Sequence, residues 1–369
     1  MKHIASEFVK QPVKHLFPPQ SVQNWEEAAL KELEGDATLE KISIKKRGLT
    51  IKPYHTHEDL PPQLLLSLPE STDTYGSARH WVNMPKVSVQ NARVANDIAL
   101  EHLQNGATGV CFDLISKTVS VEELLAKIEL PYCTIAFLAD SSRIEFFKAF
   151  HAYAENNYKP AEITGCIFWK DKLLGELSKS FITWKNFKPA GIIIQPQENL
   201  SDELAIGLYN AILGIESQTK LGSLTKDAFA SVSFSLVIGT DIFLELIMLR
   251  VLRLLWHTIE KAYNLEHQPL FIHASSPAWI KESYQPQGNL IKETYAAMVA
   301  IVGGCDALTI EAEDNTMMNR IARNTSSILH EESFFSNVAD PLAGSYYIES
   351  VTKQLAEQTW KKFQELSNA

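Results

Sequence analysis

Cysteine is scarce in this 369-residue chain, and the few cysteines present form no motif. Cys111, Cys133, Cys166 and Cys305 each lie in an apolar run, without a Cys-x-x-Cys pair. The sequence therefore does not indicate a disulfide framework or a cysteine-based zinc site. We interpret the four as reduced core residues of a cytoplasmic protein.

Positive charge is also in deficit, because 34 lysines and arginines face 44 aspartates and glutamates, for a net charge of −10. A nucleic-acid partner would favour a basic face, so we do not expect one. The N-terminal segment lacks the apolar stretch that a secretion signal needs. The most apolar stretch, 236–256, carries Asp241, Glu245, Arg250 and Arg253, which are costly in a bilayer centre. We therefore expect a buried strand and helix there, and no membrane span.

Eight short apolar runs alternate with longer amphipathic segments from Pro85 onward. Apolar runs separated by helices are typical of a parallel sheet that is covered on both faces. Eight such repeats predict an α/β fold of the (β/α)8 TIM barrel type, which needs about 250 residues. An open doubly wound sheet is the alternative, but no glycine-rich phosphate turn follows the first run. The runs are 86–90, 108–115, 132–139, 165–169, 191–196, 231–239, 270–275 and 307–312.

Residues 1–78 lie outside this rhythm and are predicted to form an N-terminal arm. Residues 24–35 have helical periodicity with Ser21 as a cap, and residues 39–54 predict a hairpin. Such an arm cannot bury a core alone, so we expect it to pack on its own barrel or on a partner. Residues 79–369 would then form the barrel and a closing C-terminal helix.

Three stretches together resemble the methylmalonyl-CoA mutase family, in the family's order and over nearly the whole chain. Residues 24–61 resemble the family's arm, in which a tryptophan-containing helix precedes an "xGIxIKPxY" hairpin. Residues 233–256 resemble a phenylalanine-rich strand that runs into an arginine-rich helix. The segment "RIARNTSSILHEESFFSNVADPLAGSYYIESVT" (320–352) is close to the family's "RIARNTQ…EE…VADPxGGSYxxE" signature.

The resemblance implies a barrel that encloses an acyl-CoA in the family's catalytic chains, but this chain departs from their site. The glutamine of their "HxQTSG" motif falls on His273, and their "LHTNAxDE" motif has Thr309, Glu311 and Asn315 at its histidine, asparagine and glutamate. Their tyrosine–histidine pair after the fifth strand is absent. Because these changes alter both hydrogen bonding and charge, we expect no catalytic residue in this chain.

The resemblance therefore implies the small, non-catalytic subunit of a heterodimeric mutase. In the family, adenosylcobalamin is held by a C-terminal domain with a "DxHxxG" motif, which this sequence lacks. We expect the cofactor on the catalytic large subunit, and no cofactor or metal on this chain. The holoenzyme would interconvert methylmalonyl-CoA and succinyl-CoA by a radical rearrangement, as in propionate metabolism. Whether this barrel binds any CoA ester stays open.

Two other functions fit parts of the sequence. The first is an acyl-CoA mutase chain of altered substrate specificity, which reads a different acyl group with His273, Glu311 and Asn315 and works with a separate cobalamin-binding chain. The second is a stand-alone barrel lyase or aldolase. That enzyme needs a lysine or a metal cluster at the strand ends, and the seventh and eighth runs show neither.

A metal cluster can be drawn from His55, His57, Glu58 and Asp59, although the polar surface of a hairpin explains the same pattern. The segment 338–352 holds a proline, small residues and paired tyrosines between two helical patterns. We interpret it as a structural corner and not as a site.

Charged residues near the eighth run have two explanations each. Asp306 and Glu311 flank that run, where they could mark a relic pocket at the C-terminal face or serve as hydrogen-bonded structural carboxylates. Arg320 and Arg323 lie three apart on one helix face, and they could clamp an anion or make ordinary salt bridges.

Overall fold

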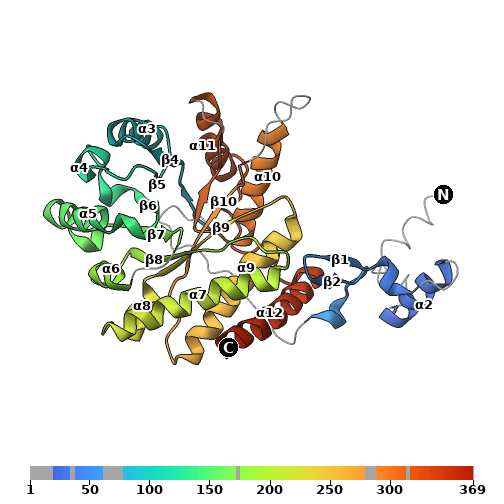
Figure 1. Ribbon diagram of the computed structural model, residues 1–369. Helices are drawn as coiled ribbons and strands as arrows, with labels where there is room; N and C mark the ends of the chain where they lie inside the picture. The colour runs from blue at the N-terminus through green and yellow to red at the C-terminus, as the bar shows by residue number, and fades with distance from the viewer. Residues whose placement is uncertain are drawn as a thin grey trace.

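The structure is a computed structural model. Its parallel strands curl into a barrel with helices outside it (Figure 1). Each predicted apolar run overlaps one strand, and the predicted (β/α)8 barrel is confirmed. The structure describes residues 20–33, 38–60, 78–171, 175–278, 288–312 and 316–368. The strands are β3 (Val82–Asn83), β4 (Lys86–Val89), β5 (Gly109–Leu114), β6 (Thr134–Ala139), β7 (Gly165–Trp169), β8 (Phe187–Ile193), β9 (Val232–Val237), β10 (Phe271–Ser275) and β11 (Ala307–Thr309).

The first strand of the barrel is made of two pieces, and it closes the ring. Only Met84 and Pro85 separate β3 from β4. β3 pairs with β11, whereas β4 pairs with β5, and both pairings are parallel. Since the two pieces bond on opposite sides, β11 and β5 become neighbours of one interrupted strand, and the edge of β4 that faces β11 stays unpaired.

One strand begins earlier than the apolar pattern predicts. β8 starts at Phe187, whereas the predicted run starts at Gly191. Lys188 and Pro189 interrupt the apolar run, and the pairing between β7 and β8 shifts register at this point. A register shift is where a sheet tolerates a proline without a backbone N–H. The apolar pattern alone therefore misses the start of this strand.

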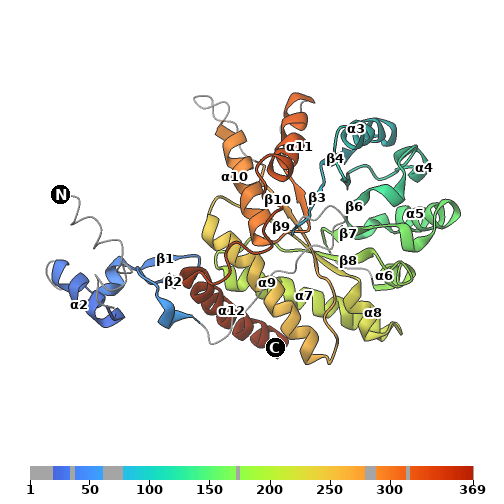
Figure 2. The same ribbon diagram turned by 180° about the vertical axis from the view of Figure 1, so that it is seen from behind.

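Helices cover the outer face of the barrel on all sides (Figures 1 and 2). None of the helices in the described ranges is long and apolar enough to cross a membrane. Their bounds are α3 (Ala92–Gln104), α4 (Val121–Leu124), α5 (Ile144–Asn157), α6 (Gly175–Ser180), α7 (Leu200–Lys220), α8 (Thr225–Ala230), α9 (Ile242–Ala262), α10 (Gly288–Gly303), α11 (Thr316–Glu331) and α12 (Tyr346–Ser367), with single turns of 3-10 helix at η2 (Leu39–Ile42), η3 (His57–Asp59), η4 (Leu130–Tyr132), η5 (Ser141–Arg143) and η6 (Pro160–Glu162).

Side chains alternate between the barrel axis and the helical layer along each strand. On β5, for example, Val110 and Phe112 join the cluster under the helices, whereas Cys111 joins the cluster on the axis. Cys133 is half-buried and the other three cysteines are buried, and all four are free thiols. The axis cluster consists of Met84, Cys111, Ala136, Cys166, Phe168 and Ala307.

The N-terminal arm meets the barrel through its hairpin. Its strands, β1 (Ile44–Lys46) and β2 (Leu49–Ile51), pair antiparallel around Arg47 and Gly48, which both have positive φ, as a tight hairpin turn requires. β2 buries Leu49 and Ile51 against the barrel core. The arm's helix, α2 (Val22–Glu32), begins at the predicted cap, where Ser21 Oγ accepts a hydrogen bond from the Asn24 N–H. α2 has no buried residue, and Figures 1 and 2 show it beyond the hairpin, away from the barrel.

The corner at 338–352 is tied to the apolar helix α9 by a buried ion cluster. Arg250 on α9 lies 2.6 Å from Asp340 and 2.9 Å from Glu349, and its side chain is fully buried. Gly344 has φ +79°, which allows the chain to turn between these two carboxylates. The Gly344 N–H also donates to Glu349 Oε1. α12 therefore starts from a fixed position and packs along α7 and α9.

Candidate functional site: the barrel axis and the seam of the first strand

His273 lies on the barrel axis with both ring nitrogens engaged. Its Nδ1 is 2.8 Å from Ser235 Oγ on β9, and its Nε2 is 2.8 Å from Thr309 Oγ1 on β11. Thr309 Oγ1 donates its own proton to the carbonyl of Met84, so it accepts from an Nε2–H, and Nδ1 accepts from Ser235. Burial lowers the pKa of His273 to about 4, and the nearby charge of Lys86 acts in the same direction. The imidazole is therefore neutral, with no nitrogen free for a ligand.

Phe168 closes the axis beside this histidine. The two rings stack with centroids 5.3 Å apart and planes 27° from parallel. Gly191 on the neighbouring strand makes room for the phenyl ring, because a Cβ at that position would lie 2.6 Å from Phe168 Cδ1. His273 is 2% exposed and Phe168 is fully buried. The axis at this level is packed with side chains and offers no space for an acyl chain.

Two ion pairs lie beside this layer; three of their members lie at or just after the C-terminal ends of strands, whereas Lys86 is the first residue of β4. Lys86 Nζ is 2.5 Å from Glu311 Oε1, and Lys170 pairs with Asp113. Lys86 is on β4 and Glu311 follows β11, so the first pair crosses the gap between the first and last strands of the ring. Each charge has an opposite partner, and this mouth carries no unbalanced charge from these four side chains.

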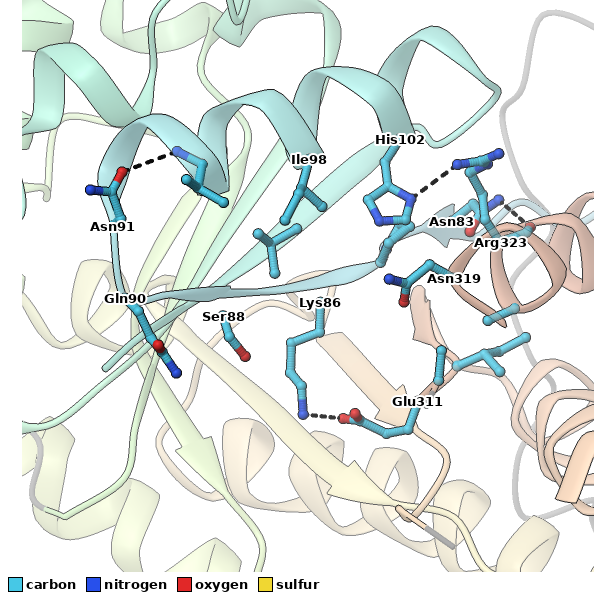
Figure 3. Close-up of a pocket in the computed structure, with 16 residues that line it drawn as sticks. Asn83, Lys86, Ser88, Gln90, Asn91, Ile98, His102, Glu311, Asn319 and Arg323 are labelled. Carbon is cyan, nitrogen blue, oxygen red and sulfur yellow. Dashed lines mark hydrogen bonds and ion pairs between the residues drawn. The ribbon is translucent and has the colours of Figure 1, made fainter. Parts of the chain in front are cut away.

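The gap between β4 and β11 opens into a cleft of about 560 Å³, which we call the seam cleft (Figure 3). It forms because β4 pairs only with β5, while β11 ends at Thr309 and pairs only with β3 on this side. α3 and α11 form its walls. Figure 3 shows the Lys86–Glu311 pair at one end and Arg323 with His102 at the other. The lining residues include Asn83, Lys86, Gln90, Ile98, His102, Glu311, Asn319 and Arg323.

Arg323 is a buried cation at the floor of the seam cleft. Its side chain is 4% exposed and donates to His102 Nδ1 at 3.2 Å, which requires a neutral imidazole. Burial lowers the pKa of both groups, and the positive charge of Arg323 lowers that of His102 further. Arg320, by contrast, is exposed. The two arginines of the predicted clamp therefore do not converge, and only Arg323 faces the cleft.

The structure brings together two of the four positions at which the chain departs from the family's site. His273 and Thr309 are hydrogen-bonded on the axis, and Glu311 lies at the mouth with Lys86. Asn315 lies outside the described residues. The placement predicted for Asp306 was wrong: it precedes β11, at the N-terminal end of the barrel, where it pairs with Arg253 and accepts from the Ile272 N–H.

The proposed cluster of His55, His57, Glu58 and Asp59 does not converge as a metal site among the residues that the structure places. Asp59 instead pairs with Lys52 and accepts from the Thr56 N–H at a capping box. His55 packs edge-on against Tyr347, with ring centroids 5.2 Å apart. The surface explanation of this pattern fits the structure.

Sequence reasoning missed the residues that pair across long separations. Lys86 is 225 residues from Glu311, and His102 is 221 residues from Arg323. Lysine at the start of an apolar run gives no local signal of its partner, since that partner follows only from ring closure. The strongest available signal was the barrel prediction itself, which makes the first and eighth strands neighbours.

The described residues do not fit a corrinoid. The resemblance places the cobalt-ligating histidine in a separate C-terminal domain, so the barrel itself could offer a ligand only through a free imidazole nitrogen at its mouth. His273 is buried below the mouth with both nitrogens hydrogen-bonded, and the side chains above it form the ion pairs of Lys86 and Lys170.

Comparisons with known proteins show similarity to methylmalonyl-CoA mutases. The methylmalonyl-CoA mutase family model matches residues 194–369. The methylmalonyl-CoA mutase small subunit of Porphyromonas gingivalis is 26% identical over 393 residues, covering 96% of this chain and 64% of that protein. The methylmalonyl-CoA mutase of Cereibacter sphaeroides is 36% identical over 177 residues, covering 46% of this chain and 25% of that protein. This chain thus spans less than two thirds of the length of these relatives.

Among solved structures, Yersinia pestis dihydropteroate synthase in a sulfonamide complex aligns with 13% identity and a TM-score of 0.36. The alignment covers 78% of this chain and 97% of that one.

Proposed function

We propose that this chain is a member of the methylmalonyl-CoA mutase family and is the small, non-catalytic subunit of a heterodimeric mutase. The holoenzyme would interconvert methylmalonyl-CoA and succinyl-CoA. The catalytic large subunit would hold adenosylcobalamin and the substrate, and this chain would scaffold that partner. We place the complex in the cytoplasm, and the four free thiols support this location.

The filled barrel axis is the observation that carries this proposal. An acyl-CoA threaded through the barrel would have to displace Phe168 and the hydrogen-bonded group of His273, Ser235 and Thr309. Displacing a fully buried phenylalanine alone costs about 3–5 kcal/mol, by analogy with substitutions of buried phenylalanine by alanine. The binding energy of a substrate would be spent on opening the core, so substrate binding on this axis is disfavoured.

The arm supports the proposed scaffolding role. α2 buries none of its residues, although it is amphipathic, and Leu30 is 43% exposed. Ile44 on β1 is 57% exposed, and Tyr54 is 46% exposed. Apolar side chains gathered on one projecting element are typical of a surface that a partner covers. We propose that this surface, which we call the arm surface, contacts the large subunit.

Sedimentation of this chain with the cobalamin-binding mutase subunit of the same organism tests the proposal. We expect a one-to-one complex, and we expect Ile44→Asp to weaken it by about tenfold or more, because the charge would be buried at the interface. Leu224→Asp is the matched control, since Leu224 is 70% exposed on the barrel and lies outside the arm. If the two chains sediment separately, or both variants weaken the complex equally, the proposal fails.

A second candidate function is an acyl-CoA mutase chain of altered specificity that works with a separate cobalamin-binding chain. The seam cleft favours it, because Arg323 faces a cavity of about 560 Å³ and its bonded side chain, His102, is neutral. Calorimetric titration of the isolated chain with coenzyme A, the part that all acyl-CoA substrates share, distinguishes the two functions. Binding that is lost when Asn319→Trp fills the cleft would support this second function, and no binding would support the scaffold.

A further inference from the structure

The end of α9 and the loop after it bring three metal-binding side chains together. His257 and Glu260 lie on α9, and His267 lies on the loop that leads to β10. The two Nδ1 atoms are 3.1 Å apart, and they lie 3.6 Å and 3.0 Å from Glu260 Oε2, respectively. Within the described part of the chain, this is the one group of three side chains whose ligand atoms converge in this way.

The local sequence explains why these residues meet. His257 and Glu260 are three positions apart, which places them on one face of the helix. Asn264 then adopts a left-handed conformation with φ 55°, and the Leu265 N–H donates to the carbonyl of Glu260. This is the reversal by which helices commonly end, and it turns the chain back over the last turn of α9. The returning loop carries His267 to Glu260.

The carboxylate of Glu260 makes no salt bridge with a lysine or arginine of the described residues, although the charge of the buried Lys188 acts on it from a longer distance. Its side chain is fully buried, and in the part of the chain that the structure covers its ion-pair partners are the two histidines, not a lysine or arginine. It also lies in the last turn of α9, where the helix dipole disfavours negative charge and favours a cation. The Gln268 N–H donates to Glu260 Oε1 at 3.2 Å and fixes the carboxylate, as the outer contacts of metal ligands often do.

A single shared proton is the most that hydrogen bonding offers these three atoms, since His267 Nδ1 can donate to both Glu260 Oε2 and His257 Nδ1. With neutral imidazoles, at least one Nδ1 then presents its lone pair to the same small space as Glu260 Oε2, so electron-pair donors converge there. A metal ion between the three atoms accepts an electron pair from each. The two imidazole rings meet edge to face, with planes 86° apart. The lone pairs of both Nδ1 atoms can therefore be directed at one metal ion.

We propose that His257, Glu260 and His267 bind a divalent transition metal of the zinc class. Tetrahedral zinc with ligands at about 2.0–2.1 Å has ligand atoms about 3.3–3.4 Å apart. The three observed separations of 3.0, 3.1 and 3.6 Å lie on both sides of that value. Imidazole nitrogen suits zinc and its neighbours, whereas calcium and magnesium prefer oxygen alone. The histidine side chains are 33% and 56% exposed, so water can take the fourth position.

The position of this site indicates a structural role. α9 ends and β10 begins at the N-terminal side of the barrel, opposite the mouth that holds Lys86 and Glu311. A bound metal would fasten the loop before β10 to the end of α9. The site thus lies apart from the arm surface and the barrel axis, and its test is independent of the proposed scaffold function.

Calorimetric titration of the metal-free chain with Zn²⁺, and absorption spectra with Co²⁺, test this proposal. We expect one equivalent of Zn²⁺ to bind and Co²⁺ to give the intense visible bands of tetrahedral coordination. His267→Gln should weaken binding by about tenfold or more, because even outer contacts of a metal site cost about 10–100-fold. His267→Cys should retain binding, since thiolate is also a zinc ligand.

His57→Gln is the control, because it removes an exposed histidine of the arm and leaves the three ligands intact. Circular dichroism would check that each variant keeps its fold, which is expected because His267 is more than half exposed. Absence of Zn²⁺ binding by the wild-type chain would overturn the proposal. So would equal binding by His267→Gln, or a loss of binding in His57→Gln.

Discussion

His273 joins three parts of the ring through neutral hydrogen bonds, to Ser235 on β9 and through Thr309 on β11 to the backbone of Met84. It is the position where the resemblance places a substrate-contacting glutamine. In this chain the side chain serves the core, because both nitrogens are used and Phe168 covers one face of the ring. A polar residue in the middle of β10 is thus part of the packing.

The neutral state of His273 gives a pH-dependent stability. Its folded pKa of about 4 lies below the ordinary value of 6.5, so the unfolded chain takes up a proton first as the pH falls. The contribution is complete above pH 6.5 and is lost as the pH falls toward 4. His273→Gln should lower the free energy of unfolding by about 1–3 kcal/mol at neutral pH, because it breaks buried hydrogen bonds.

Thermal unfolding of His273→Gln and the wild-type chain between pH 4 and 6.5 would test whether the stability contribution of His273 decreases as the pH falls. The gap between the two melting temperatures should narrow as the pH falls, because only the wild type loses this contribution. A gap that is constant or widens would mean that His273 is already charged in the folded chain.

At the scale of elements, the corner at 338–352 depends on one arginine. Arg250 lies between Asp340 and Glu349, and all three side chains are buried. Arg250→Met should cost about 3–5 kcal/mol, because it leaves two buried carboxylates without their cation. Arg93→Met removes an exposed pair with Glu123 and should cost less than about 1 kcal/mol. Urea unfolding would measure both, and similar losses would contradict a buried anchor for α12.

The hairpin of the arm depends on a second buried cluster. Arg47 at its turn lies 2.5 Å from Glu203 on α7 and 3.3 Å from Glu245 on α9. Burial raises the pKa of Glu245 to about 7, and the charges of Glu203 and Asp241 also raise it, whereas Arg47 lowers it. One cation thus serves two carboxylates that are both largely buried.

The stability contribution of Glu245 in this cluster should change with pH in the opposite direction to that of His273. The raised pKa means that Glu245 stabilises the fold below pH 4.5 and that this contribution is lost as the pH rises through 7. Glu245→Gln removes the titration, so the wild type should lose stability relative to the variant between these values, on the order of 1–3 kcal/mol. Parallel stability curves in urea at the two ends of the window would show that Glu245 stays charged throughout.

At the scale of the whole molecule, the sequence predicted the barrel because a parallel sheet buried on both faces requires continuous apolar runs. It also located the arm's helix and hairpin from a cap and an alternating pattern. Local patterns do not reveal which distant side chains meet. The Lys86–Glu311 pair, the cluster of Arg250 with Asp340 and Glu349, and the break between β3 and β4 all depend on ring closure.

The filled axis makes a prediction for the proposed heterodimer. If this chain scaffolds the large subunit, the heterodimer contains two related barrels but only one that encloses substrate. Phe168 and the bonded His273 would keep the second barrel closed in the complex as well, because both belong to its core.

Equilibrium dialysis of the purified heterodimer against methylmalonyl-CoA tests this claim most directly. The measurement is the number of acyl-CoA molecules bound per complex at saturation. A closed barrel in this chain predicts one molecule per heterodimer. Two molecules per heterodimer would show that this chain also binds substrate, and the scaffold function would have to be abandoned.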